Sequence, residues 1–146
     1  IRDGQAEGIL VHDSGLGRFD KNKIHGNAKA GFAVTKQSNP RATANEIYDG
    51  KSVGVSVSEA GLGLFVDNDI YGNETSNVSI ERQGNPTIRQ NKIHHALGFG
   101  LHVYDFGFGI IEENEVMSNK TAGVVVQNGG NPLLRDNNLS GVNLWQ

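Results

Sequence analysis

Apolar residues recur along the chain with two superimposed periods. Over short stretches they alternate with small or polar residues, as at Val55 and Val57 and at Leu101 and Val103. A period of two predicts strands with one buried face, and the β-branched content supports this assignment. Over longer stretches the whole pattern repeats every 23 residues without insertion or deletion. The chain is therefore expected to be a stacked-repeat protein, in which no unit buries its apolar face alone.

Three columns define the repeat. A Gly-aliphatic-x-aliphatic tetrad begins at Gly8, Gly31, Gly54, Asn77, Gly100 and Gly123. Asparagine follows at Asn22, Asn45, Asn68, Asn91, Asn114 and Asn137, and an aliphatic residue follows two positions later at Ile24, Ile47, Ile70, Ile93, Val116 and Leu139. We expect the asparagine to turn the chain in a left-handed conformation and to hydrogen-bond both up and down the stack.

Each repeat has room for three short strands and for no helix of useful length. One strand lies at the tetrad, one covers 64–67 and its equivalents, and one is centred on the aliphatic residue after the asparagine. This predicts an all-β fold, a right-handed single-stranded parallel β-helix of about six coils with strands ~4.8 Å apart. A leucine-rich repeat has a similar period, but its Leu-x-x-Leu-x-Leu-x-x-Asn pattern is missing. We expect residues 1–146 to form one domain, a fragment of a longer solenoid.

The turns alternate between two types. Gly-Leu-Gly or Gly-Phe-Gly occupies 15–17, 61–63 and 107–109, whereas Asn-Pro occupies 39–40, 85–86 and 131–132. The repeating unit is therefore a pair of coils. A charged column also alternates in sign, at Asp13, Lys36, Glu59, Arg82 and Asp105. We expect an ion ladder that holds register, with each exposed pair contributing only ~0–1 kcal/mol.

The chain resembles the β-helix region of F-box only protein eleven and its relatives. The resemblance lies in 8–32, 38–55, 61–73, 84–96 and 107–124, and its specific part is the alternation of Gly-Leu-Gly with Asn-Pro coils. It implies a substrate-recognition module of a cullin-type ubiquitin ligase, in the cytoplasm or nucleus. The F-box and the Cys-rich zinc module of that family are absent here. Related repeats also occur in carbohydrate-binding and carbohydrate-processing β-helices.

Composition excludes several classes of function. A net charge of −3 and a pI near 5.9 argue against a nucleic-acid partner, which would require a basic stripe. The absence of Cys excludes disulfides, thiolate metal sites and a Cys nucleophile. No apolar run approaches the ~18 residues of a membrane span, so no membrane partner is expected. We expect no cofactor.

Acids in adjacent coils are the place to look for lyase or hydrolase chemistry. Glu113 above Asp136 is the best pair and a weak candidate for a cation site. Glu112 beside it lies between Arg89 and Arg135 in its column, which is typical of a charge ladder. Stacking also brings any two acids to ~5 Å, the separation found in retaining glycosidases, so distance alone discriminates poorly. We expect no catalytic residues and no metal site.

Two outward columns are candidate binding surfaces. The first contains His25, Tyr48, Tyr71 and His94, then Met117 and Ser140, with His95 beside it. The second follows the longest strand and includes His12, His102 and Tyr104 among small polar residues, with Phe106 and Phe108 at its turn. Each is either a binding stripe or an ordinary solvent face, since solenoid faces commonly serve as extended binding surfaces.

These observations favour a non-catalytic protein-interaction module that binds a protein or peptide along one face. A carbohydrate-binding or pectate-lyase-like carbohydrate-processing β-helix is the alternative, and a self-stacking architectural rod is the third hypothesis. Asn77, which replaces the tetrad glycine, gives one coil either local specificity or mere divergence. Sequons at Asn73, Asn77, Asn119 and Asn138 are expected by chance in an asparagine-rich repeat.

Overall fold

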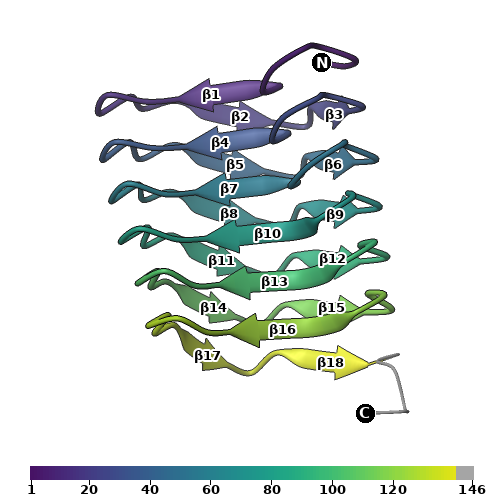
Figure 1. Ribbon diagram of the computed structural model, residues 1–146. Coiled ribbons are helices and arrows are strands. Elements are labelled where there is room, and N and C mark those ends of the chain that lie inside the picture. The colour runs from purple at the N-terminus through teal and green to yellow at the C-terminus, as the bar shows by residue number, and fades with distance from the viewer. Residues whose placement is uncertain (141–146) are drawn as a thin grey trace.

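The computed structural model describes residues 1–140 as a rod of stacked coils with three strands in each coil (Figure 1). The first sheet contains β1 (Ile9–Val11), β4 (Phe32–Val34), β7 (Val55–Val57), β10 (Ser76–Ile80), β13 (Phe99–Val103) and β16 (Ala122–Val126). The second contains β2 (Arg18–Asp20), β5 (Arg41–Thr43), β8 (Leu64–Val66), β11 (Thr87–Arg89), β14 (Ile110–Glu112) and β17 (Leu133–Arg135). The third contains β3 (Lys23–His25), β6 (Glu46–Tyr48), β9 (Asp69–Tyr71), β12 (Lys92–His94), β15 (Glu115–Met117) and β18 (Asn138–Ser140).

Pairing is parallel in all three sheets, and the paired residues lie one repeat apart. Ile47 pairs with Ile70 in the third sheet, and Val55 pairs with Val78 in the first. This register confirms the 23-residue solenoid and its three strands in each coil. None of the 18 described elements is a helix, and residues 1–140 contain no helix long and apolar enough to cross a membrane.

The core is a stack of identical positions. The aliphatic column is fully buried at Ile24, Ile47, Ile70 and Ile93, and the inward residues of the first sheet join it. Burying each such side chain contributes about 1.5–3 kcal/mol. The tetrad glycine allows the coils to approach closely, because a Cβ at Gly100 would lie 2.5 Å from the Gly123 carbonyl oxygen. In the last described coil, Leu134 stays 43% exposed because no further described coil covers it.

An asparagine ladder runs beside this core. The Asn68 side-chain amide donates to Asn91 Oδ1 at 3.0 Å and to the Ala42 carbonyl at 3.1 Å, so it bonds in both directions as expected. The conformational prediction was wrong, however. The left-handed residue is the one before each asparagine, for example Ala44 with φ 56° and Gln90 with φ 56°. From Asn45 onward, each asparagine instead uses Oδ1 to accept the backbone N–H of the preceding coil's asparagine.

A second asparagine column occurs in every other coil and was not predicted. Asn73 Oδ1 accepts the Gly50 N–H, and Asn119 Oδ1 accepts the Ala96 N–H, each at 3.0 Å. Asn77 is fully buried between these two asparagines, where its amide accepts from Asn73 and donates to Asn119. Asn77 therefore completes an internal network. Three of the sequon asparagines are at most 3% exposed, and only Asn138 is exposed.

The charged column forms only part of the expected ladder. Lys36 Nζ lies 3.9 Å from Asp13 Oδ1 in the neighbouring coil. Arg82 instead contacts Glu81 of its own coil, at 3.3 Å. The residues of this column also share a positive φ between 44° and 53°, because they form the turn that leaves the first sheet. These charged residues thus lie in a tight turn, and among their described contacts only Lys36 and Asp13 form an ion pair between successive coils.

Candidate functional site

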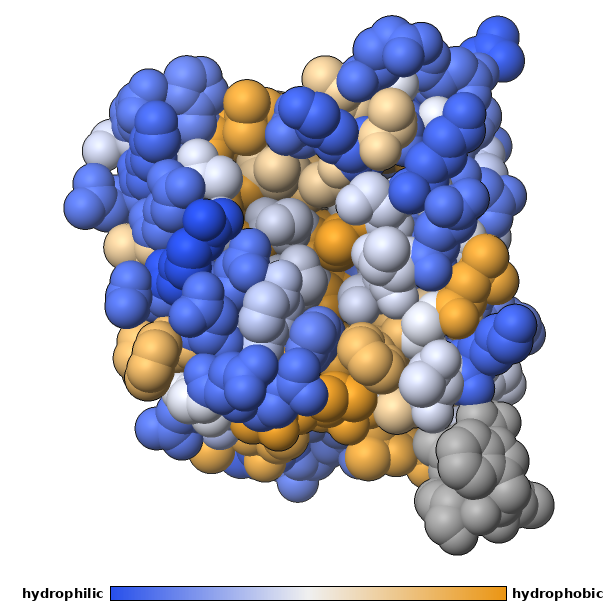
Figure 2. Space-filling view, viewed as in Figure 1, coloured by the Kyte–Doolittle hydropathy of each residue, from blue (hydrophilic) through white to orange (hydrophobic). Residues whose placement is uncertain are grey.

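A shallow groove follows the outer face of the first sheet along the rod axis. Its floor consists of small outward-facing residues, of which Ala33 and Ser79 are 5% exposed and Ser58 is 3% exposed, while Thr35 and Ser56 are half-buried. Small side chains facing outward with so little exposure lie below their larger neighbours. Figure 2 shows this face as a band of weakly polar and apolar side chains between hydrophilic margins. We call this surface the first-sheet groove.

Three rings gather at one part of the groove. The rings of His102 and Tyr104 stack with centroids 4.0 Å apart and an interplanar angle of 20°. Phe99 meets His102 edge to face at 4.9 Å. Phe99 lies at the start of β13 and is half-buried. We call Phe99, His102 and Tyr104 the ring cluster.

The surroundings of the ring cluster shift the pKa values of Tyr104 and His102 in opposite directions. Burial, a hydrogen bond to Glu81 and that carboxylate's charge raise the pKa of Tyr104 to about 12. Burial also lowers the pKa of His102, and the Glu81 charge only partly opposes this shift. His102 Nε2 is buried without a hydrogen-bond partner. At neutral pH the groove therefore presents a protonated phenol next to a neutral imidazole.

The remaining predicted members of this stripe lie apart from the ring cluster. His12 occupies the same column as Tyr104 but four coils away, where Nδ1 contacts Asp13 Oδ2 at 2.7 Å. Phe106 lies in the turn after β13, 57% exposed, with its ring next to Gly129. The structure thus brings together His102 and Tyr104 only. Glu81, 23 residues before Tyr104, was missed because its column was considered only for aromatic and small residues.

The third sheet carries the other predicted stripe as a continuous stack of rings. Successive centroids from His25 through Tyr48 and Tyr71 to His94 are 4.7, 5.0 and 5.0 Å apart, with interplanar angles of 14° or less. We call these four residues the ring column. Stacking covers the ring faces, so mainly edges and polar atoms face solvent. The column is therefore poorly suited to stacking against a ligand.

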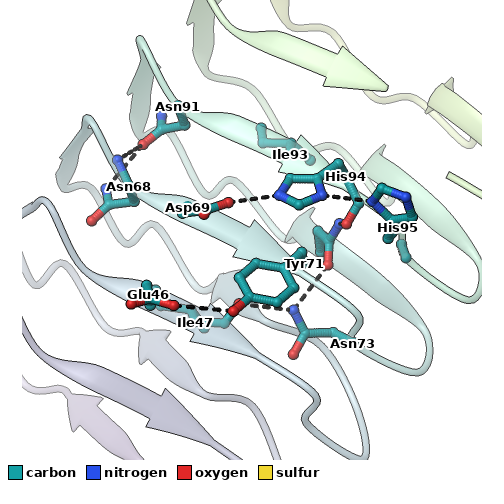
Figure 3. Close-up of polar contacts among 12 residues, drawn as sticks. Glu46, Ile47, Asn68, Asp69, Tyr71, Asn73, Asn91, Ile93, His94 and His95 are labelled. Atoms are coloured by element: carbon teal, nitrogen blue, oxygen red, sulfur yellow. Dashed lines mark hydrogen bonds and ion pairs between the residues drawn. The ribbon is translucent and has the colours of Figure 1, made fainter. Parts of the chain in front are cut away.

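Carboxylates hold the polar atoms of the ring column (Figure 3). The Tyr71 hydroxyl donates to Glu46 Oε2 at 3.0 Å, and burial together with this bond raises the pKa of Tyr71. His94 Nε2 lies 2.7 Å from Asp69 Oδ1. Both acids precede their partner by 25 residues, one coil plus two positions. This diagonal spacing on one sheet face is a signal that inspection of single columns misses.

The acidic candidates remain at the edge of the molecule. Glu113 accepts a hydrogen bond from Gln90 Nε2 at 3.0 Å, and Arg135 pairs with Glu112 across the coils as a charge ladder predicts. Asp136 lies in the last described coil. Among residues 1–140, no group of three or more His, Cys, Asp and Glu side chains is placed to hold a metal ion.

The fold is shared with a known family. A family model described as the right handed beta helix region matches residues 1–139. The chain belongs to this family. Membership confirms the expected handedness of the right-handed beta helix. No curated protein matches the chain in sequence.

Solved structures that superimpose on this chain include alginate epimerases. The periplasmic alginate epimerase AlgG superimposes with a TM-score of 0.71 at 16% identity, over 94% of this chain and 43% of the epimerase. The A-module of a mannuronan C-5 epimerase from Azotobacter vinelandii gives 0.66 at 19% identity, over 97% of this chain and 51% of that module. The beta helix thus spans about half the length of these proteins, and this likeness shows the fold.

Two expectations from the sequence change here. The comparisons support the beta helix itself, and nothing in them links the chain to F-box only protein eleven. The cytoplasmic or nuclear localisation is corrected, because one neighbour is described as periplasmic. That description of the neighbour points away from the cytoplasm and nucleus.

Proposed function

We propose that this chain is a carbohydrate-binding β-helix that holds an extended polysaccharide in the first-sheet groove. The observation that carries the proposal is the floor of small, outward-facing yet buried side chains leading to the ring cluster. A polysaccharide chain matches a groove that continues from coil to coil, and aromatic rings with polar ends suit sugars, which have both apolar and hydroxyl surfaces. The epimerase neighbours, which act on alginate or mannuronan, make uronans the first ligands to test.

Binding is tested by calorimetry with mannuronate oligosaccharides, and neutral glucan oligosaccharides serve as a comparison. Wild type is expected to bind at least one of these glycans. His102→Ala and Tyr104→Ala should weaken that binding at least tenfold. Tyr48→Ala, a ring-column change on another face, is the matched control and should leave it unchanged. Wild-type protein that binds neither class of glycan contradicts the proposal.

Carbohydrate processing at the same site is a second candidate function. The neutral His102 next to the protonated Tyr104 favours it, because proton removal and proton donation need groups held in opposite states. The test is product formation from polymannuronate, followed by NMR for epimerised residues and by ultraviolet absorbance for chain cleavage. Binding without turnover leaves a carbohydrate-binding module. Capture of a protein by this same groove, without glycan binding, would favour the interaction-module hypothesis.

A further inference from the structure

The molecule has a second polar cluster that the groove does not use. It lies at the end of the ring column, where β12 finishes and the chain turns. His94 Nδ1 and His95 Nδ1 face each other at 2.7 Å, and His94 Nε2 faces Asp69 Oδ1 at the same distance (Figure 3). We call His94 and His95 the imidazole pair.

We propose that the imidazole pair binds a late first-row divalent metal ion, with Cu²⁺ the tightest, through the two Nδ1 atoms. In the metal-free protein one proton lies between these nitrogens, since one must donate and the other accept. Two nitrogens bound at about 2.0–2.1 Å to one ion lie about 3 Å apart, so replacing this proton needs an opening of a few tenths of an ångström and a turn of the exposed His95 ring that points both lone pairs at the ion. Imidazole is a ligand that Cu, Ni and Zn share, and Cu²⁺ heads the affinity order.

The surroundings prepare the pair for a metal. Asp69 holds the far nitrogen of His94, the arrangement that fixes tautomer and ring orientation behind many metal-bound histidines. Stacking on Tyr71 at 5.0 Å restrains the same ring. The positive φ of His95, 54°, turns the chain so that adjacent residues direct their rings at each other. Met117 on β15 pairs in register with His94 on β12, and it adds a soft thioether to the same outward column.

The imidazole pair has fewer protein ligands than the three or four of an ordinary zinc centre. It offers two protein nitrogens, and solvent would complete the coordination, so no group of three ligands is required. His95 is exposed and His94 is half-buried, so an ion can reach the pair from solvent. The site lies on the third sheet and not in the first-sheet groove. The metal-binding proposal can therefore be tested independently of glycan binding.

The experiment is titration of the 146-residue chain with Cu²⁺, and separately with Zn²⁺, followed by calorimetry and by electron paramagnetic resonance of the copper form. We expect one Cu²⁺ per chain with two imidazole nitrogens in its spectrum. His95→Ala should weaken Cu²⁺ binding more than tenfold, and Asp69→Asn should weaken it 10- to 100-fold while both ligands remain. His25→Ala is the matched control, because His25 ends the same ring column without an adjacent histidine.

Thermal unfolding of each variant without metal separates misfolding from loss of the site. His95 lies at the exposed end of the cluster, so His95→Ala should unfold at the wild-type temperature within a few degrees. The proposal is overturned if wild type takes up no Cu²⁺, if His95→Ala binds it as tightly as wild type, or if His25→Ala weakens it equally.

Discussion

The first-sheet groove and the ring column are two outward faces of the same coils, yet they use aromatic residues in opposite ways. In the ring column every coil from His25 to His94 supplies a ring, and the rings cover one another at about the strand spacing. In the groove the ring cluster lies in one coil, and several of the preceding coils carry small, buried residues at outward positions, namely Ala33, Ser58 and Ser79. A column filled in each coil stabilises the stack, whereas a column of small residues with a local exception leaves room for a ligand.

The largest expected effect comes from a substitution in the core, because both faces depend on it. Ile70→Asp places a carboxylate in a fully buried column and should cost about 4 kcal/mol or more of unfolding free energy. Urea unfolding followed by circular dichroism measures it. Ser56→Asp, at an outward position of the first sheet, is the matched control and should unfold like wild type. A normal unfolding midpoint for Ile70→Asp would contradict the inward assignment of the column.

The asparagine ladder gives the next largest effect. Asn68→Ala leaves the buried Asn45 N–H without its acceptor and removes the bond to Asn91, so we expect a loss of about 2–4 kcal/mol. Asn22→Ala, in a half-buried first-coil position, should lose less. Both values come from denaturant unfolding. Equal losses at the two positions would show that the bonds in the middle of the ladder are no stronger than those at its start.

Filling the groove separates the two faces directly. Ser56→Phe should reduce glycan affinity at least tenfold, because the new ring occupies the floor, and should leave Cu²⁺ affinity unchanged. Thr87→Phe introduces the same ring at a half-buried outward position of the second sheet, and it should leave both affinities unchanged. Calorimetry with each ligand provides the measurements. If Ser56→Phe binds glycan like wild type, the ligand does not lie along this floor.

The fold was predictable because it depends on residues that are the same in each coil. Ile47 and Ile70 occupy the same column, and their identity predicts both strand and register. The left-handed residue was misassigned because the asparagine is constant while the residue that takes positive φ, such as Ala44 or Gln90, varies. A constant side chain indicated a ladder of hydrogen bonds, not the position of the turn.

The site was less predictable, because its contacts join different columns. Asp69 reaches His94 diagonally across 25 residues, and Asn77 links asparagines that occur only in alternate coils. The depth of the groove depends on how far neighbouring side chains project above Ala33 and Ser79, which a column of residue names does not state. The candidate sites of this solenoid therefore lie where the residues depart from the 23-residue repeat.

The smallest expected effect is a pH dependence that distinguishes the groove phenol. Tyr104 has a pKa of about 12 in the folded protein, above its ordinary value near 10. The unfolded chain therefore loses this proton first as the pH rises. The stability contributed by the protonated phenol is complete below pH 10 and is lost between about pH 10 and 12.

Tyr104→Phe should flatten this alkaline loss of stability by a few tenths of a kcal/mol, up to about 1 kcal/mol, because the ring is half-exposed and solvent screens its charge. Tyr48→Phe is the matched control, since Tyr48 stacks in the ring column away from Glu81. Urea midpoints from pH 8 to 11.5 provide the measurement. Parallel curves for wild type and Tyr104→Phe would mean that Glu81 does not hold the phenol proton.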